Sequence, residues 1–525
     1  MRRFNVTGLC NPNMHYMVDI TGKLEQIKEM IDYGDYFTIN QGRQYGKTTT
    51  LSRLTEFLKL EYTVVFLSFE NWDDENFATS ENFCQNLLQH IKAGLNVVGE
   101  SVEYQNSWLD SKIVNLGQLS AHIEKMCEDK KIVLMIDEVD KISNSRVFLQ
   151  FLGILRAKYL QRADGRGVTF HSVILVGVYD IKNIKLKMIN DGIYTPSENE
   201  NNLRTSPWNI ATAFEVEMSF NPTEIATMLV EYEKDYAIGM DIDAISKEIY
   251  AYTSGYPFMV SRICQIIHTK LDKDWSEFGV CDAFSILIRE DNQLFKDLSK
   301  NLENSESLYK LMYDVLILAV RRSYTIINPV IEMAHRYDYI KPYRGSVGIA
   351  NKVFETVISN YFVSKGEEAS PFQRTNALYH EIIKEDYFDM ELFVKKFADF
   401  FNREIFPTKE KELLEIQYRM SFISYLKPFL NGIGNYHLET QLADERRLDV
   451  VVNYLKNEYI IELKRVFAES DRTDGINQLL GYMDSRGADT GYLLTFDFRK
   501  KSEPKVEWKV EWLEFNDKRI LEVNV

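Results

Sequence analysis

The sequence of 525 residues is poor in several features that define whole classes of protein. Its 5 cysteines form no C-x-x-C pair, which argues against a zinc finger and a disulfide-built fold and fits a reducing cytoplasm. With 25 glycines and 11 prolines it is neither collagen-like nor of low complexity. No run approaches the roughly 20 apolar residues that span a bilayer, and the basic start lacks the apolar core of a signal peptide. We therefore expect a soluble cytoplasmic protein without a membrane partner.

Positive charge is also in deficit. The chain has 62 Lys and Arg against 78 Asp and Glu, a formal charge of −16, which excludes a wholly basic nucleic-acid coat protein. The window 319–352 is a local exception, because it holds six basic and two acidic residues. The length suggests about three or four domains, and a 45% hydrophobic composition allows each to bury a core.

Strand-like and helix-like patterns alternate over residues 1–220. This alternation predicts βαβ units and an α/β fold whose parallel sheet is covered on both faces. The apolar runs of strand length are 36–40, 63–69, 131–137 and 172–178, and the helical stretches include 81–95 and 116–129. Over 221–300 the pattern becomes helical, with two helices separated by a turn at 254–257.

The remaining residues predict a small mixed unit and then a second αβ region. The mixed unit has helices near 306–322, 326–336 and 348–361, with a strand and turn over 360–370. An aromatic helical stretch follows at 387–406, and its spacing favours a core stripe over base stacking. The second αβ region has strands near 436–442, 447–454, 458–465 and 489–497 and helices at 409–430 and 471–485.

The first motif with chemical content is QGRQYGKTT, residues 41–49. It lies between an extended run and an apolar-periodic helix, the context in which loop N–H groups and a helix dipole hold phosphates. Lys47 would reach the β- and γ-phosphates, and the Thr48 hydroxyl would bind Mg²⁺. The first glycine of the usual pattern is replaced by Gln41. The expected nucleotide contacts are Gly42, Arg43, Gln44, Tyr45, Gly46, Lys47, Thr48 and Thr49.

A second motif is an apolar strand that ends in Asp137 and Glu138. Because doubly wound sheets bind ligands beyond the carboxyl ends of their strands, Asp137 would hold Mg²⁺ and Glu138 would polarise the attacking water. The run at 172–178 is followed by Asp180 and Asn183, either of which could sense a γ-phosphate; an Asx turn is the alternative. The two motifs together predict ATP and Mg²⁺ as ligands.

Three arginines are candidates for completing a nucleotide site. Arg262 follows the turn at 254–257, from which a helical lid could present it to the nucleotide; a solvated arginine near a helix start is the alternative. Arg156 and Arg162 follow the acidic strand and could complete a neighbouring site. A solvated helix face is the favoured interpretation of these two.

A separate constellation lies near the carboxyl end. Glu462 and Lys464 share one face of the strand at 458–465, and Asp449 begins the preceding strand at a hairpin distance. Two carboxylates with a lysine suit a metal-assisted hydrolase, in which oxygens bind Mg²⁺ and the lysine orients water. The preceding helix offers Glu412 or Glu415 as a further ligand, and we favour Glu415. The following helix offers Gln478. Exposed charge pairs across strands are the alternative.

The blocks INQGRQYGKTTTL, VLMIDEVD, SVILVGVYDIKN and SGYPFMVSR resemble the bacterial AAA-ATPase-like family. That family is usually fused to a nuclease-like domain of the PD-(D/E)xK superfamily, which RRLDVVVNY, YIIELK and NQLLGYMD resemble. The resemblance implies ATP at Lys47, Thr48, Asp137 and Glu138. It also implies Mg²⁺ at Asp449 and Glu462, with Lys464 as the catalytic lysine. Leu448 stands where the usual nuclease motif has proline.

The resemblance implies a P-loop NTPase parallel sheet with a helical lid and a winged-helix region, followed by a restriction-endonuclease-like α/β domain. The expected boundaries are 1–220 for the ATPase core, 221–300 for the lid, 301–375 for the winged-helix-like region, 376–406 for a helical connector and 407–525 for the nuclease-like domain.

The leading functional hypothesis is a P-loop ATPase whose conformational cycle regulates a Mg²⁺-dependent nuclease. Its partner would be nucleic acid, DNA in preference to RNA, contacted by the window 319–352. One alternative is a regulatory nucleotide switch whose nuclease-like domain binds nucleic acid or protein without cutting it. A structural interaction protein with neither activity is a third. The oligomeric state is left open, with a homo-oligomer as one option.

Overall fold

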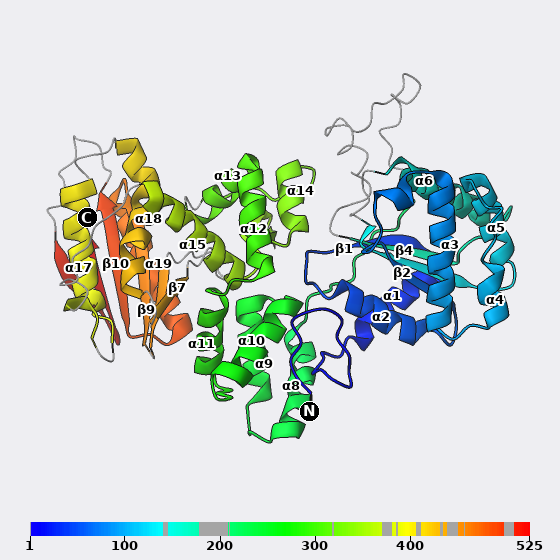
Figure 1. Cartoon of the computed structure of the whole chain (residues 1–525). Coiled ribbons are helices and arrows are strands. Elements are labelled where there is room, and N and C mark those ends of the chain that lie inside the picture. The colour runs from blue at the N-terminus through cyan, green and yellow to red at the C-terminus, as the bar shows by residue number, and fades with distance from the viewer. Residues whose placement is uncertain are drawn as a thin grey trace. The chain divides into compact units, whose positions relative to one another are not determined.

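The structure is a computed structural model that describes residues 2–139, 145–177, 208, 210–317, 320–369, 381–384, 387–405, 411–430, 434–437, 450–455, 457–497 and 509–525. The chain divides into two compact units (Figure 1). The first comprises residues 1–238 and 255–261, and the second comprises residues 239–254 and 262–525.

The first unit is built around a parallel four-stranded sheet in the order β1-β4-β3-β2. Its strands are β1 (Tyr36–Asn40), β2 (Thr63–Ser68), β3 (Ile132–Asp137) and β4 (Ser172–Gly177). Its helices are α1 (Thr21–Asp32), α2 (Lys47–Leu58), α3 (Ser80–Val97), α4 (Val102–Ser107), α5 (Leu116–Met126), α6 (Arg146–Ala163) and α8 (Pro222–Tyr236), with a 3₁₀ turn at Asp74–Phe77. The α/β architecture and the four strands predicted from the apolar runs are confirmed.

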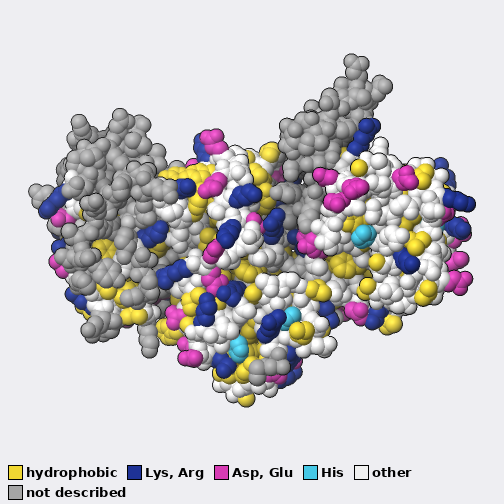
Figure 2. All heavy atoms as spheres, in the orientation of Figure 1, with side chains coloured by type: hydrophobic (Ala, Val, Ile, Leu, Met, Phe, Trp, Pro, Cys, Tyr) yellow, Lys and Arg dark blue, Asp and Glu magenta, His cyan; other side chains and the backbone are white. Residues whose placement is uncertain are grey.

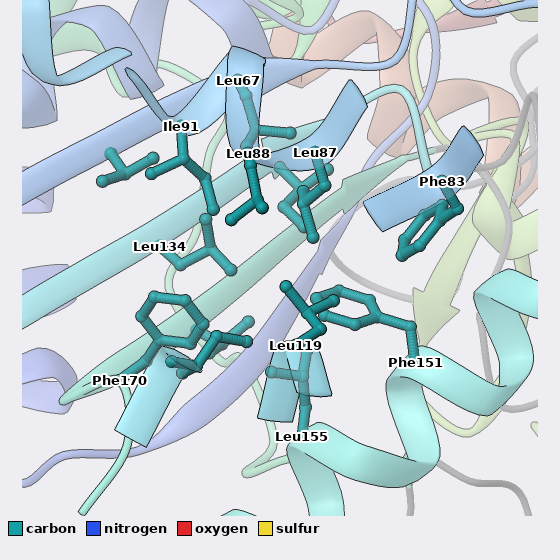
Figure 3. Packing of buried hydrophobic residues seen from close by; sticks show 14 of the residues in the cluster. Leu67, Phe83, Leu87, Leu88, Ile91, Leu119, Leu134, Phe151, Leu155 and Phe170 are labelled. Atoms are coloured by element: carbon teal, nitrogen blue, oxygen red, sulfur yellow. The ribbon is translucent and has the colours of Figure 1, made fainter. Parts of the chain in front are cut away.

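The sheet is buried on both faces, which explains its uninterrupted apolar strands. Every residue of β3 and β4 is buried, as strands covered on two sides require. On one face, side chains from α3, α5 and α6 meet those of β2 and β3 (Figure 3). Phe83, Leu119, Phe151 and Leu134 lie in this cluster with no solvent exposure. Apolar burial of this kind contributes about 1.5–3 kcal/mol for each large side chain.

The strand order determines where polar groups can meet. Since all four strands run in the same direction, their carboxyl ends lie along one edge of the sheet. β4 separates β1 from β3 and pairs with both. The loop after β1 and the acidic end of β3 therefore flank the end of β4. A parallel bridge between Phe37 and Thr212 extends the sheet beyond β1.

The second unit begins with helices and a short hairpin. The helices are α9 (Ile242–Thr253), α11 (Glu277–Leu287), α12 (Gln293–Asn304), α13 (Glu306–Leu316), α14 (Pro329–Arg336) and α15 (Lys352–Ala369), and α10 (Pro257–Lys270) enters this unit at Arg262. The hairpin pairs β5 (Ile340–Tyr343) with β6 (Ser346–Ile349). The predicted separation of α9 from α10 at 254–257 is confirmed.

The strand and turn predicted over 360–370 are wrong, because α15 continues as a helix to Ala369. The Phe362 side chain is buried, and its ring lies 4.9 Å from that of Tyr309 and 5.3 Å from that of Tyr313. Helical spacing brings Phe362 onto the same packed face as Ile358, which is also buried. Tertiary packing against α13 therefore favours the helix here.

A mixed six-stranded sheet in the order β11-β12-β10-β9-β8-β7 completes the second unit. Its strands are β7 (Gly434–His437), β8 (Val450–Tyr454), β9 (Asn457–Val466), β10 (Thr490–Asp497), β11 (Val510–Phe515) and β12 (Lys518–Asn524). The helices are α17 (Met390–Phe400), which continues as a π-helical turn (Phe401–Ile405), α18 (Lys411–Leu430) and α19 (Glu469–Arg486). The predicted β8–β9 hairpin is confirmed. α19 connects the parallel strands β9 and β10 and packs on both (Figure 1).

The aromatic stretch 387–406 contributes to the core of this second sheet. Phe393 and Phe397 have no exposed surface, and Phe397 packs against Phe422 at 5.0 Å between ring centroids. Phe401 packs against Phe496 of β10 at 5.2 Å. These rings are unavailable for stacking on bases, so the core-stripe interpretation holds for them.

We predict that Gly255→Ala destabilises the protein far more than Gly99→Ala. Both glycines have a positive φ, +74° and +79° respectively, so alanine costs about 1–2 kcal/mol at either position. A Cβ at position 255 would also lie 1.9 Å from the carbonyl oxygen of Phe220, whereas none would collide at position 99. We expect the free energy of unfolding of Gly255→Ala to fall by at least about 1–3 kcal/mol more than that of Gly99→Ala. Denaturant unfolding of the two variants measures it, and equal losses would contradict the close packing at Gly255.

Candidate functional site

The loop between β1 and α2 has the backbone of a phosphate cradle. Gln44 and Gly46 have positive φ values of +57° and +78°. Gly46 precedes the first residue of α2, and among the described residues no side chain caps this helix. The Lys47 Nζ donates hydrogen bonds of 2.8 Å and 2.9 Å to the carbonyl oxygens of Gln41 and Gly42. The loop thus curves around the ammonium group, and helix N–H groups and a cation lie at one place.

The acidic strand reaches this loop through one short hydrogen bond. The Thr48 hydroxyl donates to Asp137 Oδ2 at 2.6 Å, and Asp137 is only 1% exposed. The backbone N–H of Glu138 donates to Asp137 Oδ1 at 2.9 Å. Glu138 has a positive φ of +58°, an uncommon conformation for a residue with a side chain. Thr48 and Asp137 therefore offer two hard oxygen atoms at one point, a donor set that fits Mg²⁺.

Two tyrosines fasten the loop to the segment that precedes α10. The ring of Tyr45 lies 4.7 Å from that of Tyr256 in an edge-to-face arrangement. The Tyr256 hydroxyl donates to the carbonyl oxygen of Arg43. Sequence reasoning missed Tyr256, although it lies in the turn that was recognised at 254–257. Its role depends on a contact across more than 200 residues, which no local pattern reports.

A cavity of about 310 Å³ adjoins the loop within the first unit. Gly46 and Thr49 form part of its wall, and the Thr49 hydroxyl accepts a hydrogen bond of 3.3 Å from the backbone N–H of Cys10. Most of the lining is apolar. It includes Val6, Tyr16, Val18, Met218, Phe220 and Phe258. The sequence analysis did not anticipate this cavity, because its wall combines segments that are distant along the chain.

Arg262 lies in the second unit and is held by a carboxylate there. Its Nε and Nη2 atoms lie 2.7 Å and 2.5 Å from the two oxygens of Glu290. Lys270 also contacts Glu290 at 3.2 Å. Burial acts to raise the pKa of Glu290, but the bonds and charge of Arg262 hold it below its usual range. The nucleotide contact expected of Arg262 stays a prediction. Asp180 and Asn183 lie outside the described residues.

Arg162 binds main-chain oxygens, so the interpretation of a solvated helix face is wrong, and its role at a neighbouring site stays a prediction. Its guanidinium donates to the backbone carbonyls of Gly34, Phe170 and His171 and stacks over Tyr36 at 5.3 Å. These contacts fasten α6 to the segments that lead into β1 and β4. Its donors are committed to main-chain oxygens, which sequence periodicity on α6 does not reveal. The role considered for Arg156 stays a prediction.

In the second sheet, the structure brings three of the expected polar groups together. Glu462 and Lys464 of β9 lie on the face covered by α19, whose Gly475 packs on the Lys464 side chain. The Lys464 Nζ donates to Gln478 Oε1 at 3.1 Å. Glu462 is 3% exposed, and its Oε2 atom has no hydrogen-bond partner within the described part of the chain.

Burial raises the pKa of Glu462 to about 8, although the charges of Lys464 and Arg419 act to lower it. A buried carboxyl with an unpaired oxygen is costly unless something pairs with it. Asp449 lies outside the described residues, directly before β8 in the sequence. The backbone of Glu415 lies in α18, and its side chain is outside the described part. The ligand roles of Asp449, Glu462 and Glu415 stay predictions.

The basic window 319–352 is partly neutralised by nearby acids. Arg322 pairs with Asp314 of α13, and Arg336 pairs with Glu332 within α14. Arg321 donates to the Ser346 hydroxyl at 2.7 Å. On the face drawn in Figure 2, basic side chains around α12–α14 are interspersed with acidic ones. Nearby carboxylates therefore offset part of the positive charge of the window.

Comparison with known proteins agrees with the loop geometry. A family model described as an AAA-like domain matches residues 12–316, more than half of the chain. The chain belongs to the AAA-like domain family. The matched region contains β1, the loop 41–46, Thr48 and Asp137. In fold, this AAA-like region is an α/β unit with a parallel sheet, consistent with a P-loop NTPase.

The individual proteins that resemble this chain have low sequence identity to it. The WD repeat-containing protein slr0143 of Synechocystis is 22% identical over 376 residues, which are 68% of this chain. The chain spans 28% of the length of that relative. Among solved structures, the Walker-type ATPase paby2304 of Pyrococcus abyssi is 13% identical, with a TM-score of 0.47, and covers 68% of this chain and 99% of its own.

A second similar structure is the ORC2 protein of Aeropyrum pernix, in complexes with ADPNP and ADP. It is 13% identical with a TM-score of 0.33, and the match covers 70% of this chain and 98% of the ORC2 chain. The Cdc6p of Pyrobaculum aerophilum is 15% identical with a TM-score of 0.29, and the match covers 66% of this chain and 94% of the Cdc6p chain. A search of the helices in the described residues finds none long and apolar enough to cross a membrane.

The raised pKa of Glu462 predicts a pH dependence of stability. The folded, metal-free protein binds this proton more tightly than the unfolded chain, where glutamate has a pKa of about 4.3. The resulting stability is complete below that value and is lost as pH rises through about 8. In EDTA, we expect the unfolding temperature of the wild type to fall with rising pH more steeply than that of Glu462→Gln.

Glu514→Gln is the matched control for this experiment, because Glu514 is exposed on β11 of the same sheet. It should follow the wild-type pH profile. If Glu462→Gln also follows the wild-type profile, the raised pKa is not a property of the folded protein.

Proposed function

We propose that this AAA-like chain is a P-loop ATPase whose nucleotide cycle regulates a carboxyl-terminal Mg²⁺-dependent nuclease of PD-(D/E)xK type. The observation that carries the ATPase proposal is the hydrogen bond of 2.6 Å between Thr48 and Asp137, beside the ammonium group of Lys47. A hydroxyl, a buried carboxylate and a cation at one helix N-terminus suit a nucleoside triphosphate. The family match over residues 12–316 supports the same assignment.

Each side chain of the loop then has a definite task. Lys47 exchanges its two carbonyl partners for phosphate oxygens, so the chain itself supplies one cation at the phosphates. Thr48 and Asp137 would hold Mg²⁺, which when bound neutralises charge on the phosphates. Glu138 accepts a proton from the attacking water and orients it as general base. The positive φ of Glu138 supports this role, because strained backbone concentrates at functional residues.

The cavity beside Gly46 and Thr49 takes the nucleoside in this proposal. Its apolar lining and its volume of about 310 Å³ suit a flat aromatic base. The residues that line the cavity belong to the same unit as the loop. A nucleotide would therefore lie across the start of α2, with the phosphates at the loop and the base against Val18 and Phe258.

The nuclease proposal rests on β9 and the elements that cover it. Glu462 and Lys464 share the face beneath α19, and Gln478 of α19 holds the Lys464 ammonium. The Glu462 carboxylate would hold Mg²⁺, with Asp449 and Glu415 as further ligands. In this arrangement Lys464 orients the attacking water and stabilises the charge that develops on the phosphate. The region 407–525 would be restriction-endonuclease-like.

Nucleic acid, DNA in preference to RNA, is the proposed partner of the second unit. The support is a three-stranded arrangement in which residues 322–324 pair with β6 of the hairpin. With α13, α14 and α15 this arrangement suits a winged helix. Arg321, Arg322, Lys341 and Arg344 are exposed on it, and exposed cations on a hairpin suit the phosphate backbone of a duplex.

A second candidate is the regulatory switch, whose nuclease-like domain binds nucleic acid or protein without cutting. The raised pKa of Glu462 favours it, because a buried carboxyl that keeps its proton near pH 7 is a poor metal ligand. Under this candidate the ATPase site is unchanged, and the second sheet serves as a binding module.

Lys47→Ala should lower ATP affinity at least about 10-fold and abolish hydrolysis, since it removes the cation at the phosphates. Glu138→Gln should keep ATP binding while hydrolysis falls about 100-fold or more, as expected for loss of a general base. Calorimetric titration and phosphate release measure the two quantities. Lys59→Ala, at the far end of α2, is the control and should behave as wild type. Wild-type hydrolysis by Lys47→Ala would contradict the ATPase proposal.

Lys464→Ala and Glu462→Gln should each abolish Mg²⁺-dependent cleavage of DNA while ATP hydrolysis persists. The assay compares single- and double-stranded DNA and RNA, with and without ATP. Lys395→Ala, on α17, removes a partly exposed lysine of the same unit and should leave cleavage intact. Undiminished cleavage in Lys464→Ala would contradict the nuclease proposal. A wild type that hydrolyses ATP and cuts nothing would support the switch.

A further inference from the structure

The segment of residues 2–18, here called the strap, forms one wall of the cavity beside the phosphate loop. Residues 5–8 and 16–18 of the strap line the cavity. Gly8 has a positive φ of +65°, which turns the chain back within this wall. The backbone of Arg3 is hydrogen-bonded to Met14 and Tyr16 at 3.0 Å in a parallel bridge to His15, so the strap is folded on itself as a loop.

The strap is fastened to α8 by an aromatic anchor. Phe4 is 1% exposed, and its ring lies 5.0 Å from Tyr16 and 5.2 Å from Tyr232 of α8. Tyr16 and Tyr232 also contact each other at 5.2 Å. The three buried rings join both ends of the strap to one helix. Met228 of α8 lines the same cavity, so this helix forms both the anchor and a part of the wall.

A charged clamp lies next to the anchor. The Arg2 guanidinium is 2.9 Å from Glu231 Oε2 and 3.1 Å from Asp235 Oδ2, both on α8. The Tyr16 hydroxyl donates to the same Asp235 oxygen at 2.8 Å, and Arg2 lies 4.9 Å over the Tyr16 ring. The side chains of Arg2, Glu231 and Asp235 are 25%, 38% and 36% exposed. We therefore expect the clamp to contribute less than the buried anchor.

We propose that Arg2 and Phe4 are positioning residues that set the affinity of the site for the nucleoside part of a nucleotide. This inference rests on the proposed function, because it assumes that a nucleotide occupies the loop and the cavity. Neither side chain belongs to the phosphate loop. They act through the strap, which they hold against α8 so that residues 5–8 close the apolar wall around the base. The phosphate cradle of Lys47 and α2 is fastened by Tyr45 and Tyr256, and the strap meets it in one weak hydrogen bond of 3.3 Å, from the Cys10 N–H to the Thr49 hydroxyl.

This separation gives a test that distinguishes the strap from the phosphate loop. The full chain is titrated with ATP and, separately, with inorganic tripolyphosphate, which offers phosphates without a base. We expect Phe4→Ala to weaken ATP binding about 10-fold or more and Arg2→Ala about 3-fold, with tripolyphosphate binding unchanged in both. Arg2→Lys, which keeps the charge, should restore part of the ATP affinity. Lys47→Ala should weaken both ligands.

Arg3→Ala is the matched control, since it removes the same charge at a neighbouring exposed position. It should leave both affinities at wild-type values. Because Phe4→Ala also removes a buried ring, the unfolding temperature of this variant is measured. If Phe4→Ala does not fold, the test rests on Arg2→Ala, since the Arg2 side chain is partly exposed. Asp235→Asn removes the other side of the clamp and should not weaken ATP binding further when combined with Arg2→Ala.

The outcomes separate this inference from the function on which it rests. If wild-type protein binds ATP, Lys47→Ala does not, and Arg2→Ala binds ATP as tightly as wild type, the inference is overturned while the ATPase proposal stands. If Arg2→Ala weakens ATP and tripolyphosphate equally, the strap acts on the phosphates or on general stability, and the inference is again overturned. If the wild type binds neither ligand, the proposed function itself fails.

Discussion

The first unit depends on one hydrogen bond that crosses the end of its sheet. β1 and β3 are not neighbours, because β4 lies between them and pairs with both. The phosphate loop and the acidic strand are therefore joined by side chains, Thr48 and Asp137, at 2.6 Å. Asp137 is almost completely buried, so its carboxylate needs this donor and the N–H of Glu138. Without the Thr48 hydroxyl or the Glu138 N–H, the buried carboxylate of Asp137 would be short of a hydrogen bond, which costs about 1–3 kcal/mol or more.

In the second unit, a helix packed closely on the sheet holds polar side chains in place. α19 lies directly on β9 and β10, and glycine makes this approach possible at Gly475 and Gly491. A Cβ at position 475 would lie 3.2 Å from the Lys464 side chain, and one at 491 would lie 2.7 Å from the Met483 sulfur. The short distance from helix to sheet lets Gln478 reach Lys464. Polar groups of β9 are thereby held in one arrangement beneath a helix, where water is largely excluded.

The local elements could be predicted from the sequence to a large extent. The sequences of β2, β3 and β4 are continuous apolar runs because the sheet is covered on both faces. Such a run can be recognised in the sequence alone. The loop 41–49 and Asp137 were recognisable since their residue types follow the chemistry of phosphates and metals. The β8–β9 hairpin followed from alternation, whereas the domain boundaries that the family resemblance implies stay predictions.

Contacts between residues that are far apart in the sequence could not be predicted. Arg162 looked like a surface arginine because its three carbonyl partners are not encoded in the periodicity of α6. α15 continues from residue 360 to Ala369 because Phe362 packs on α13, which outweighs a weak local signal. The cavity wall formed by the strap depends on Phe4 meeting Tyr232, 228 positions away. The basic window lost part of its charge to Asp314, which lies just outside it in the sequence.

The most direct test of the account is the affinity for ATP measured with and without Mg²⁺, in wild type, Thr48→Val and Asp137→Asn. The account predicts that Mg²⁺ strengthens ATP binding in the wild type and that both substitutions remove this increment. Metal-free ATP should bind all three proteins through Lys47 and the helix N-terminus. An equal Mg²⁺ increment in the wild type and in Asp137→Asn would contradict the assignment of this hydrogen-bonded pair as the metal site.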